Sequence, residues 1–270
     1  MDDSALVADA ARGGDAAMRV DTLALRIEEA ALNATVVREQ MLYDGWLVRW
    51  APAAAKRARS INVIAPAHPE LSEKLVFCKT LYARAKLPLI FRLNSTGPDR
   101  ELDGQLAARG FLRYGETSVM VMSMRTSAGT SLQAGLRYEQ TDPGRFADVT
   151  GTLRAYNAGH VIEHRHRLAS IAVPCVRLLA RDEAGRHVAA GMAVVDGDVA
   201  GIFDVVVDES VRRRGYGRQI MHRLLDAACQ AGARSAYLQV EYANTSARQL
   251  YASLGFSDRY TYWYRTHQHE

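Results

Sequence analysis

The sequence predicts a mixed α/β fold, and two observations lead to that prediction. Capped amphipathic segments alternate along the chain with short apolar runs that are typical of strands. In addition, a helix that ends in Gly-Phe and is followed by an alternating strand occurs in each half. A chain of 270 residues is long for one compact domain and comfortable for two.

The first half of the predicted fold begins after residues 1–20, which carry no apolar period and are expected to form a flexible N-terminus. Asp21 is a suitable cap for a helix that reaches Ala34. The expected elements that follow are strands 46–50 and 60–64, helix 72–85, strand 89–93, helix 102–109 and strand 119–122.

Small polar residues at 127–134 predict a linker between a first domain, 21–126, and a second domain, 135–270. The second domain is expected to open with strand 136–139 and a helix from Pro143. Further strands are expected at 175–180, 188–195, 200–207 and 237–241, with hairpin turns at 182–185 and 196–198 and helices from 216 and 245.

The two Gly-Phe pairs, Gly110-Phe111 and Gly255-Phe256, are 145 residues apart. The same offset aligns the strand at Phe91 with the strand at Tyr237. We therefore predict one fold used twice, and an unrelated first α/β domain is the alternative.

The composition excludes several classes of protein. No apolar run approaches the ~18 residues of a membrane span, and the N-terminal residues do not resemble an export signal. Three widely spaced cysteines suit reduced thiols, so a cytoplasmic protein is expected. A net charge of +4 is compatible with an anionic ligand but is too weak to indicate nucleic-acid binding.

An Arg- and Gly-rich turn at 212–218 joins an apolar strand that ends at Val207 to an amphipathic helix. Gly215 and Gly217 allow the backbone to approach a ligand, and the first amides of the helix favour negative charge. The turn is therefore predicted to hold an anion such as a pyrophosphate. An exposed basic turn with a glycine cap is the alternative.

Downstream of this turn, the strand that ends at Glu241 leads to Asn244 and a helix that stops before Gly255-Phe256. The two segments together resemble the GCN5-related N-acetyltransferase superfamily over residues 136–265. Its pyrophosphate motif Q/R-x-x-G-x-G/A is matched by residues 212–217. Its later motif is matched by Asn244, Ala247, Leu250, Tyr251, Gly255 and Phe256.

This resemblance implies a central mixed sheet whose fourth and fifth strands splay apart and admit the pantetheine arm of acetyl-CoA. Backbone groups of the fourth strand would bind the arm, and amides of the basic turn would hold the pyrophosphate. The acetyl-CoA-binding residues that it implies are Val205, Val206, Val207, Arg212, Arg213, Arg214, Gly215, Tyr216, Gly217, Arg218, Asn244 and Tyr251.

The resemblance also implies that an amine attacks the thioester directly while Tyr251 protonates the departing thiolate. A phenol with a pKa of about 10 can donate a proton to a thiolate whose parent pKa is about 8.5. A packed aromatic residue on a helix is the alternative for Tyr251. The attacking ammonium must lose a proton, and Asp204 is the first candidate base and Glu241 the second. Either acid could instead be structural.

Glu163 and His164 lie where the second helix of the family borders the acceptor pocket, and they are candidates for contact with the substrate. A metal site is not expected, because no third ligand is evident near the histidines of this segment.

In the first half, the offset places Leu106 at the position of Tyr251 and puts acids and prolines near the glycine positions. That half is therefore predicted to be a degenerate acetyltransferase-like domain that shapes the acceptor site.

The resulting hypothesis is an acetyl-CoA-dependent N-acetyltransferase that acts on a small-molecule or peptide amine. A non-catalytic acyl-CoA sensor is the alternative, and DNA binding through residues 212–214 has little support. No membrane partner is expected. A monomer and a homodimer both remain open.

Overall fold

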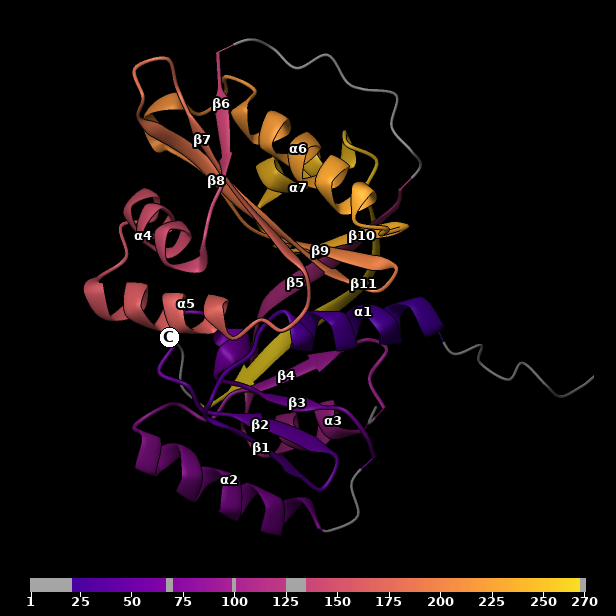
Figure 1. Cartoon of the computed structure of the whole chain (residues 1–270). Coiled ribbons are helices and arrows are strands. Elements are labelled where there is room, and N and C mark those ends of the chain that lie inside the picture. Colours follow the sequence, from indigo (N-terminus) through magenta and orange to yellow (C-terminus); the bar gives the residue numbers. More distant parts are fainter. Residues whose placement is uncertain (1–20, 67–69, 99–100, 125–134, 268–270) are drawn as a thin grey trace, which may run out of the picture.

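The computed structural model describes residues 21–66, 70–98, 101–124 and 135–267, and these residues form a mixed α/β fold (Figure 1). One sheet of 11 strands runs through the described part of the chain in the order β1-β2-β3-β4-β11-β5-β10-β9-β8-β7-β6. The predicted N-terminal segment 1–20 and linker 127–134 lie outside the described residues.

The helices and strands follow the predicted order closely. The helices are α1 (Thr22–Asn33), α2 (Leu71–Ala85), α3 (Leu102–Ala108), α4 (Pro143–Leu153), α5 (Ala158–Ala169), α6 (Tyr216–Gln230) and α7 (Thr245–Ala252), with 3-10 turns at Lys56–Ala58 and Glu209–Val211. The strands are β1 (Gln40–Tyr43), β2 (Trp46–Arg49), β3 (Ile61–Val63), β4 (Phe91–Asn94), β5 (Leu112–Ser123), β6 (Arg137–Gln140), β7 (Cys175–Arg181), β8 (His187–Asp196), β9 (Val199–Val207), β10 (Ser235–Glu241) and β11 (Ser257–Thr266).

Two strands differ from the expectation. Strand β5 begins at Leu112 rather than at Val119, because its polar first half pairs with β11 and needs no apolar pattern of its own. Strand β1 was not predicted. It forms a hairpin with β2 through Asp44 and Gly45, both of which have positive φ.

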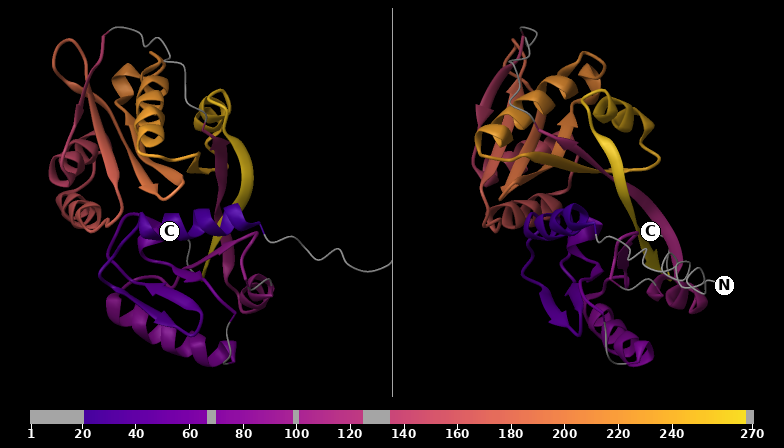
Figure 2. Two further views of the ribbon diagram at one scale, coloured as in Figure 1. Left: turned by 45° about the vertical axis from the view of Figure 1, so that its right-hand side comes forward. Right: turned by 90° about the vertical axis from the view of Figure 1, so that its right-hand side faces the viewer.

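The two halves of the chain exchange their last strands. Strand β5 of the first half pairs with β10, and β11 at the end of the second half pairs with β4. Strands β5 and β11 also pair with each other, and they run side by side between the two parts of the molecule (Figures 1 and 2). The sheet therefore crosses the predicted boundary between domains 21–126 and 135–270.

The pairing of β5 with β11 has the symmetry of the 145-residue offset. Thr117 lies opposite Tyr262, and these two residues are themselves 145 positions apart. The pairs Val121–Ser257 and Leu112–Thr266 exchange with each other under the same offset. An approximate two-fold axis therefore passes between the strands, with β4 and β10 in equivalent positions on either side.

Helix α1 connects the two halves from one face of this sheet. It packs against β9, and Ala24, Ile27 and Ala30 on it are buried. Arg26 donates hydrogen bonds to the carboxylate and the carbonyl of Asp196, in the β8–β9 turn, at 2.5 and 2.7 Å. A helix from the N-terminal half thus covers part of the C-terminal sheet (Figure 1).

A buried ion pair attaches α1 to the shared part of the sheet. Arg92 on β4 donates to both carboxylate oxygens of Glu28 at 2.5 and 2.9 Å, and the Tyr260 hydroxyl on β11 donates to the same carboxylate at 2.6 Å. Burial alone would raise the pKa of Glu28, but Arg92 and Tyr260 outweigh that effect and hold the pKa below its usual value. Glu28 therefore stays ionised.

None of the helices in the part of the chain that the structure describes has both the length and the apolar character that crossing a membrane requires.

Replacing Glu28 by Gln should lower the free energy of unfolding by about 3–5 kcal/mol, because it leaves the buried charge of Arg92 without a counterion. Glu29→Gln is the matched control, since Glu29 is on the same helix with a side chain that is 67% exposed, and its effect should stay within about 0.5 kcal/mol. Urea unfolding measures both. Equal losses in the two variants would contradict the role of the pair.

Candidate active site

The C-terminal part of the sheet opens between β9 and β10. These parallel strands are paired from Val199 and Ser235 as far as Ile202 and Leu238. Beyond that point β9 continues to Val207 and β10 to Glu241 without further pairing between them. The expected splay of the fourth and fifth strands of the second half is therefore present, and we call the gap the β9–β10 fork.

A β-bulge lies on the β9 side of the fork. Met192 of β8 is opposite Phe203, while Ala190 is opposite Val206, so Asp204 and Val205 together face a single residue. Asp204 has φ +52°, a left-handed conformation that aspartate tolerates better than most residues. Asp204 thus lies in the bulge itself.

The backbone of Val207 turns toward the fork. The amide of Asp208 donates to the Val188 carbonyl of β8 at 2.9 Å, and Val207 lies opposite Ala189. Since antiparallel strands alternate hydrogen-bonded and non-bonded pairs, the N–H and C=O of Val207 point away from β8. This side of the strand can accept an extended ligand as an added strand.

The basic turn after β9 has the backbone expected of an anion site. Gly215 has φ +80° and precedes the first residue of α6, and Arg213 has φ +66°. Two of the arginines have protein partners, because Arg212 pairs with Glu209 at 2.9 Å and Arg218 donates to Ser253 at 2.7 Å. Arg213 and Arg214 are exposed. The first amides of α6 remain available for an anion.

Helix α7 presents Asn244 and Tyr251 to the same region. The Asn244 side-chain oxygen caps the helix by accepting from the amide of Ala247 at 3.1 Å, which leaves the side-chain NH₂ group free to donate. Tyr251 is half-buried and packs against Phe256, with ring centroids 6.2 Å apart. Burial raises the pKa of the Tyr251 phenol, so the side chain keeps its proton near neutral pH.

A cavity of about 440 Å³ joins these groups. From the C-terminal half it is lined by the fork, by Asp204 and Glu241, and by Asn244 and Tyr251 of α7. The N-terminal half contributes residues 54–57 and Thr117. The structure thus brings together Tyr251, Asp204, Glu241, Val205 and Asn244, and the wall opposite them comes from the other half of the chain.

Asp204 is paired with His164, which α5 carries. The two side chains are 3.0 Å apart, and Arg154 lies 3.9 Å from the same carboxylate. Burial raises the pKa of Asp204, but the interaction with His164 and the charges of Arg167 and Arg154 lower it more, to well below its usual value. Asp204 is therefore ionised at neutral pH.

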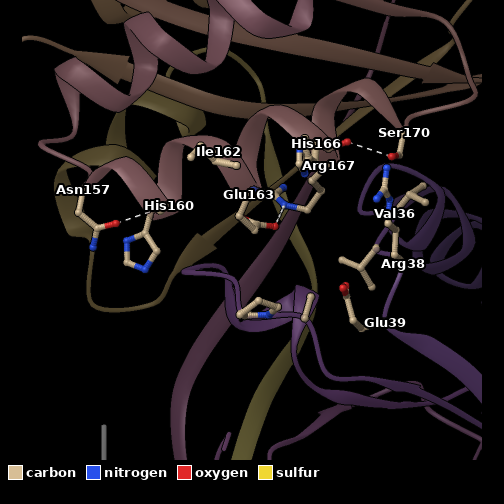
Figure 3. Close-up of a pocket in the computed structure, with 14 residues that line it drawn as sticks. Val36, Arg38, Glu39, Asn157, His160, Ile162, Glu163, His166, Arg167 and Ser170 are labelled. Carbon is tan, nitrogen blue, oxygen red and sulfur yellow. Dashed lines mark hydrogen bonds and ion pairs between the residues drawn. The ribbon is translucent and has the colours of Figure 1, made fainter. Parts of the chain in front are cut away.

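Glu163 lies elsewhere. It forms an ion pair with Arg167 at 3.0 Å and lines a second cavity of about 510 Å³, between α5 and residues 36–39 and 51–52. Figure 3 shows this pair on the α5 side of that cavity, with Arg38 and Glu39 on the other side. Glu163 thus does not share the cavity of Tyr251, although its neighbour His164 reaches Asp204.

The sequence reasoning missed three cations of the main cavity, Lys56, Arg57 and Arg154. Arg154 follows the end of α4, and Lys56 and Arg57 lie in a segment without periodicity, so no local pattern marked them. Lys56 and Arg57 are revealed only by the contact between the halves, and Arg154 by its contact with Asp204 within the second half. Among the described residues no group of three or more His, Cys, Asp or Glu side chains could hold a metal ion.

Residues 146–256 match the sequence model described as the acetyltransferase (GNAT) family. This region contains the fork, the basic turn and α7. It is a GNAT domain. The superfamily suggested by the two motifs is thus confirmed for this part of the chain.

Two relatives extend this result. The chain is 25% identical over 244 residues to the uncharacterized N-acetyltransferase YobR of Bacillus subtilis, covering 89% of this chain and 97% of that protein. It is 34% identical over 74 residues to the ribosomal protein bS18-alanine N-acetyltransferase of Escherichia coli K12, covering 27% of this chain and 50% of that enzyme.

Solved GNAT structures share the fold over most of the chain. A GCN5-related N-acetyltransferase from Kribbella flavida superposes with a TM-score of 0.68 at 17% identity, covering 92% of this chain and 96% of that one. A tandem GNAT protein from the clavulanic acid biosynthesis pathway gives a TM-score of 0.59 at 15% identity, covering 78% and 76%.

Replacing Asp204 by Asn should lower the free energy of unfolding at pH 7 by about 1–3 kcal/mol, because the side chain loses its charged interaction with His164. A carboxyl whose pKa is lowered on folding stabilises the protein above its unfolded value, and that contribution disappears as the pH falls through the folded value. The difference from wild type should therefore shrink only below pH 3.8, the usual pKa of this group.

Urea unfolding at a series of pH values tests this expectation. Glu209→Gln serves as the control, because it removes a negative charge from a side chain that follows the same strand and is 79% exposed. A difference between Asp204→Asn and wild type that already shrinks between pH 6 and 5 would contradict the assignment.

Proposed function

We propose that the protein is an acetyl-CoA-dependent N-acetyltransferase that transfers an acetyl group to a primary amine. The observation that carries this proposal is the position of the fork. Its open end adjoins the turn at Gly215, and both Tyr251 and Asp204 line the cavity beside it. All of these residues lie within the GNAT domain.

The residues around the fork fit acetyl-CoA. Val207 offers an N–H and a C=O to the pantetheine arm, and Asn244 offers a side-chain NH₂ group. The amides of residues 213–218 fit the pyrophosphate, with the arginines of the turn adding positive charge. Arg154 donates to the Val205 carbonyl at 3.4 Å and would have to release it for an arm bound there. Acetyl-CoA supplies the thioester.

Tyr251 is proposed as the general acid. Its raised pKa keeps the phenol protonated, and the proton is favourably transferred to a departing thiolate only if the two groups lie close together. The position of the side chain in the cavity supports that contact. Packing against Phe256 holds the ring in place.

Asp204 is proposed to bind the incoming ammonium and to help remove its proton. A carboxylate whose pKa is this low attracts a cation strongly but is a weak base, so proton transfer from the ammonium would also involve water. Glu241, exposed at the end of β10 and on the cavity wall, is the second candidate base.

The acceptor is proposed to be a small-molecule amine or a peptide amine. The bacterial relative named for the alanine of a ribosomal protein illustrates the second class. A sensor that binds acyl-CoA without turnover is the alternative function. The combination of a protonated phenol and an ionised carboxylate in one cavity favours the enzyme.

The division of labour between the halves is also proposed. Residues 135–270 would form the catalytic domain and residues 21–126 a degenerate copy. Leu106, at the position equivalent to Tyr251, is buried and apolar. The first half would then act by completing the acceptor cavity rather than by binding acetyl-CoA.

Tyr251→Phe should lower kcat by about 10²–10⁴-fold, because the departing thiolate loses its proton donor. Thiol release from acetyl-CoA, measured with a panel of amines, reports this rate. Tyr242→Phe is the control, since Tyr242 is 51% exposed and lies in the connection between β10 and α7. Unimpaired turnover of Tyr251→Phe would rule out the assignment, and tight acetyl-CoA binding with no release for any amine would favour the sensor.

Gly215→Ala should weaken acetyl-CoA binding at least about tenfold, since a Cβ at φ +80° strains the turn that presents the amides. Gly232→Ala is the matched control. Gly232 also has positive φ, near the other end of α6, and a Cβ there would meet no atom within 4 Å. Both variants should lose similar stability, and titration calorimetry should show that only Gly215→Ala loses affinity. Equal affinities would contradict the proposed role of the turn.

A further inference from the structure

Two cations from the N-terminal half project into the cavity of the GNAT domain. Lys56 and Arg57 form the start of the 3-10 turn Lys56–Ala58, and both are half-buried cavity-lining residues. Neither forms an ion pair with any residue that the structure describes. Half-buried cations that face a cavity without a carboxylate partner are unusual and indicate a ligand.

Arg57 lies at the point where the fork begins. Its guanidinium donates to the side-chain oxygen of Gln239 and lies 5.5 Å from the ring centroid of Phe203. Phe203 and Gln239 directly follow Ile202 and Leu238, the last paired residues of the two strands. The side-chain nitrogen of Gln239 is buried and has no hydrogen-bond partner within the described residues. It is therefore a further hydrogen-bond donor available to a ligand beside the Arg57 guanidinium.

Lys56 lies beside two aromatic rings. Its Nζ is 4.9 Å from the ring centroid of Tyr114 and 5.6 Å from that of Tyr264. Such contacts steady an ammonium group but leave its charge unneutralised. The ammonium is therefore held in place with its hydrogen-bonding capacity available.

The acidic groups nearby do not neutralise these two cations. Asp204 already interacts with His164 and Arg154, and Glu241 is at the exposed end of β10. The charge of Arg57 helps to lower the pKa of Glu28, but the Glu28 carboxylate already forms a bidentate pair with Arg92. The start of the fork thus keeps a surplus of positive charge.

The phosphates of acetyl-CoA would lie too far away to neutralise this positive charge. The proposed pyrophosphate turn follows the other end of β9, and the extended strand from Ile202 to Val207 separates the two places by roughly 16 Å. The cations therefore face the part of the cavity left for the acceptor.

We propose that Lys56 and Arg57 bind a carboxylate of the acceptor, so that the substrate is an amino-acid-like molecule with an amine and a carboxylate. This inference rests on the proposed function. Asp204 attracts the ammonium and Arg57 the carboxylate, which orients the amine toward the thioester. The N–C bond forms as the C–S bond breaks. The sulfur takes a proton from Tyr251. The ammonium gives up two protons, of which one is released to solvent and the other restores the Tyr251 phenol.

The first experiment compares acids with their uncharged amides. Wild-type protein and acetyl-CoA are incubated with the twenty L-amino acids and with their carboxamides, and acetylated products are identified by mass spectrometry. Acetylation of one or more acids at least about tenfold faster than the matching amide is expected. Equal or faster acetylation of the amides overturns the proposal, and so does the absence of any acetylated acid.

Calorimetry with acetyl-CoA separates the two levels of the hypothesis. Binding of acetyl-CoA without acetylation of any acid overturns the carboxylate site and leaves the GNAT activity open. No binding of acetyl-CoA overturns the proposed function, and the carboxylate site falls with it.

The second experiment uses the best acid with the variants Lys56→Gln and Arg57→Gln. Each should raise KM for the acid at least about tenfold and leave KM for its amide and for acetyl-CoA unchanged. Lys79→Gln is the control, because Lys79 is exposed on α2, and it should change none of these values. The Lys56 side chain makes no hydrogen bond to any residue that the structure describes, so its variant reports on binding even if Arg57→Gln folds poorly. Equal losses for acid and amide overturn the proposal.

Discussion

The antiparallel pairing of β5 with β11 is the interaction on which the rest of the structure depends. Through it each half of the chain receives the last strand of the other, so β4 gains β11 and β10 gains β5. The order of the sheet then places the turn at Lys56 across from the β9–β10 fork. The cavity between the halves is a product of this exchange and does not belong to either half alone.

Buried charge fixes how the halves meet. The Glu28 carboxylate on α1 binds Arg92 of β4 and Tyr260 of β11, and Arg26 on the same helix reaches Asp196 in the C-terminal half. These contacts attach α1 to both halves, and Figure 2 shows from two sides that the helix lies between them. The cavity wall that carries Arg57 is therefore positioned by directional bonds as well as by apolar packing.

Much of the fold could be predicted because its signals are local. Asp21 caps its helix through its own side chain, as expected, and the Asp196-Gly197 turn makes the expected hairpin. The site was predictable where a motif is contiguous, as at Gly215. Lys56 and Arg57 could not be found, because their relation to Asp204 exists only after distant strands pair. Glu163 and His164 were predicted together from their place on the second helix of the family. Successive helical residues point about 100° apart, however, and Glu163 faces a different cavity.

The exchange of strands also affects how the chain can fold during synthesis. Strand β4 is made early, whereas its neighbour β11 is made more than 160 residues later. Until then the edge of β4 stays open, and an open edge can pair with a second chain. The pairing spans more than 160 residues, as between Phe91 and Arg265, so closing it is slow. The sheet of the N-terminal half is therefore complete only after β11 has been made, and a chain truncated before β11 would lack the neighbour of both β4 and β5.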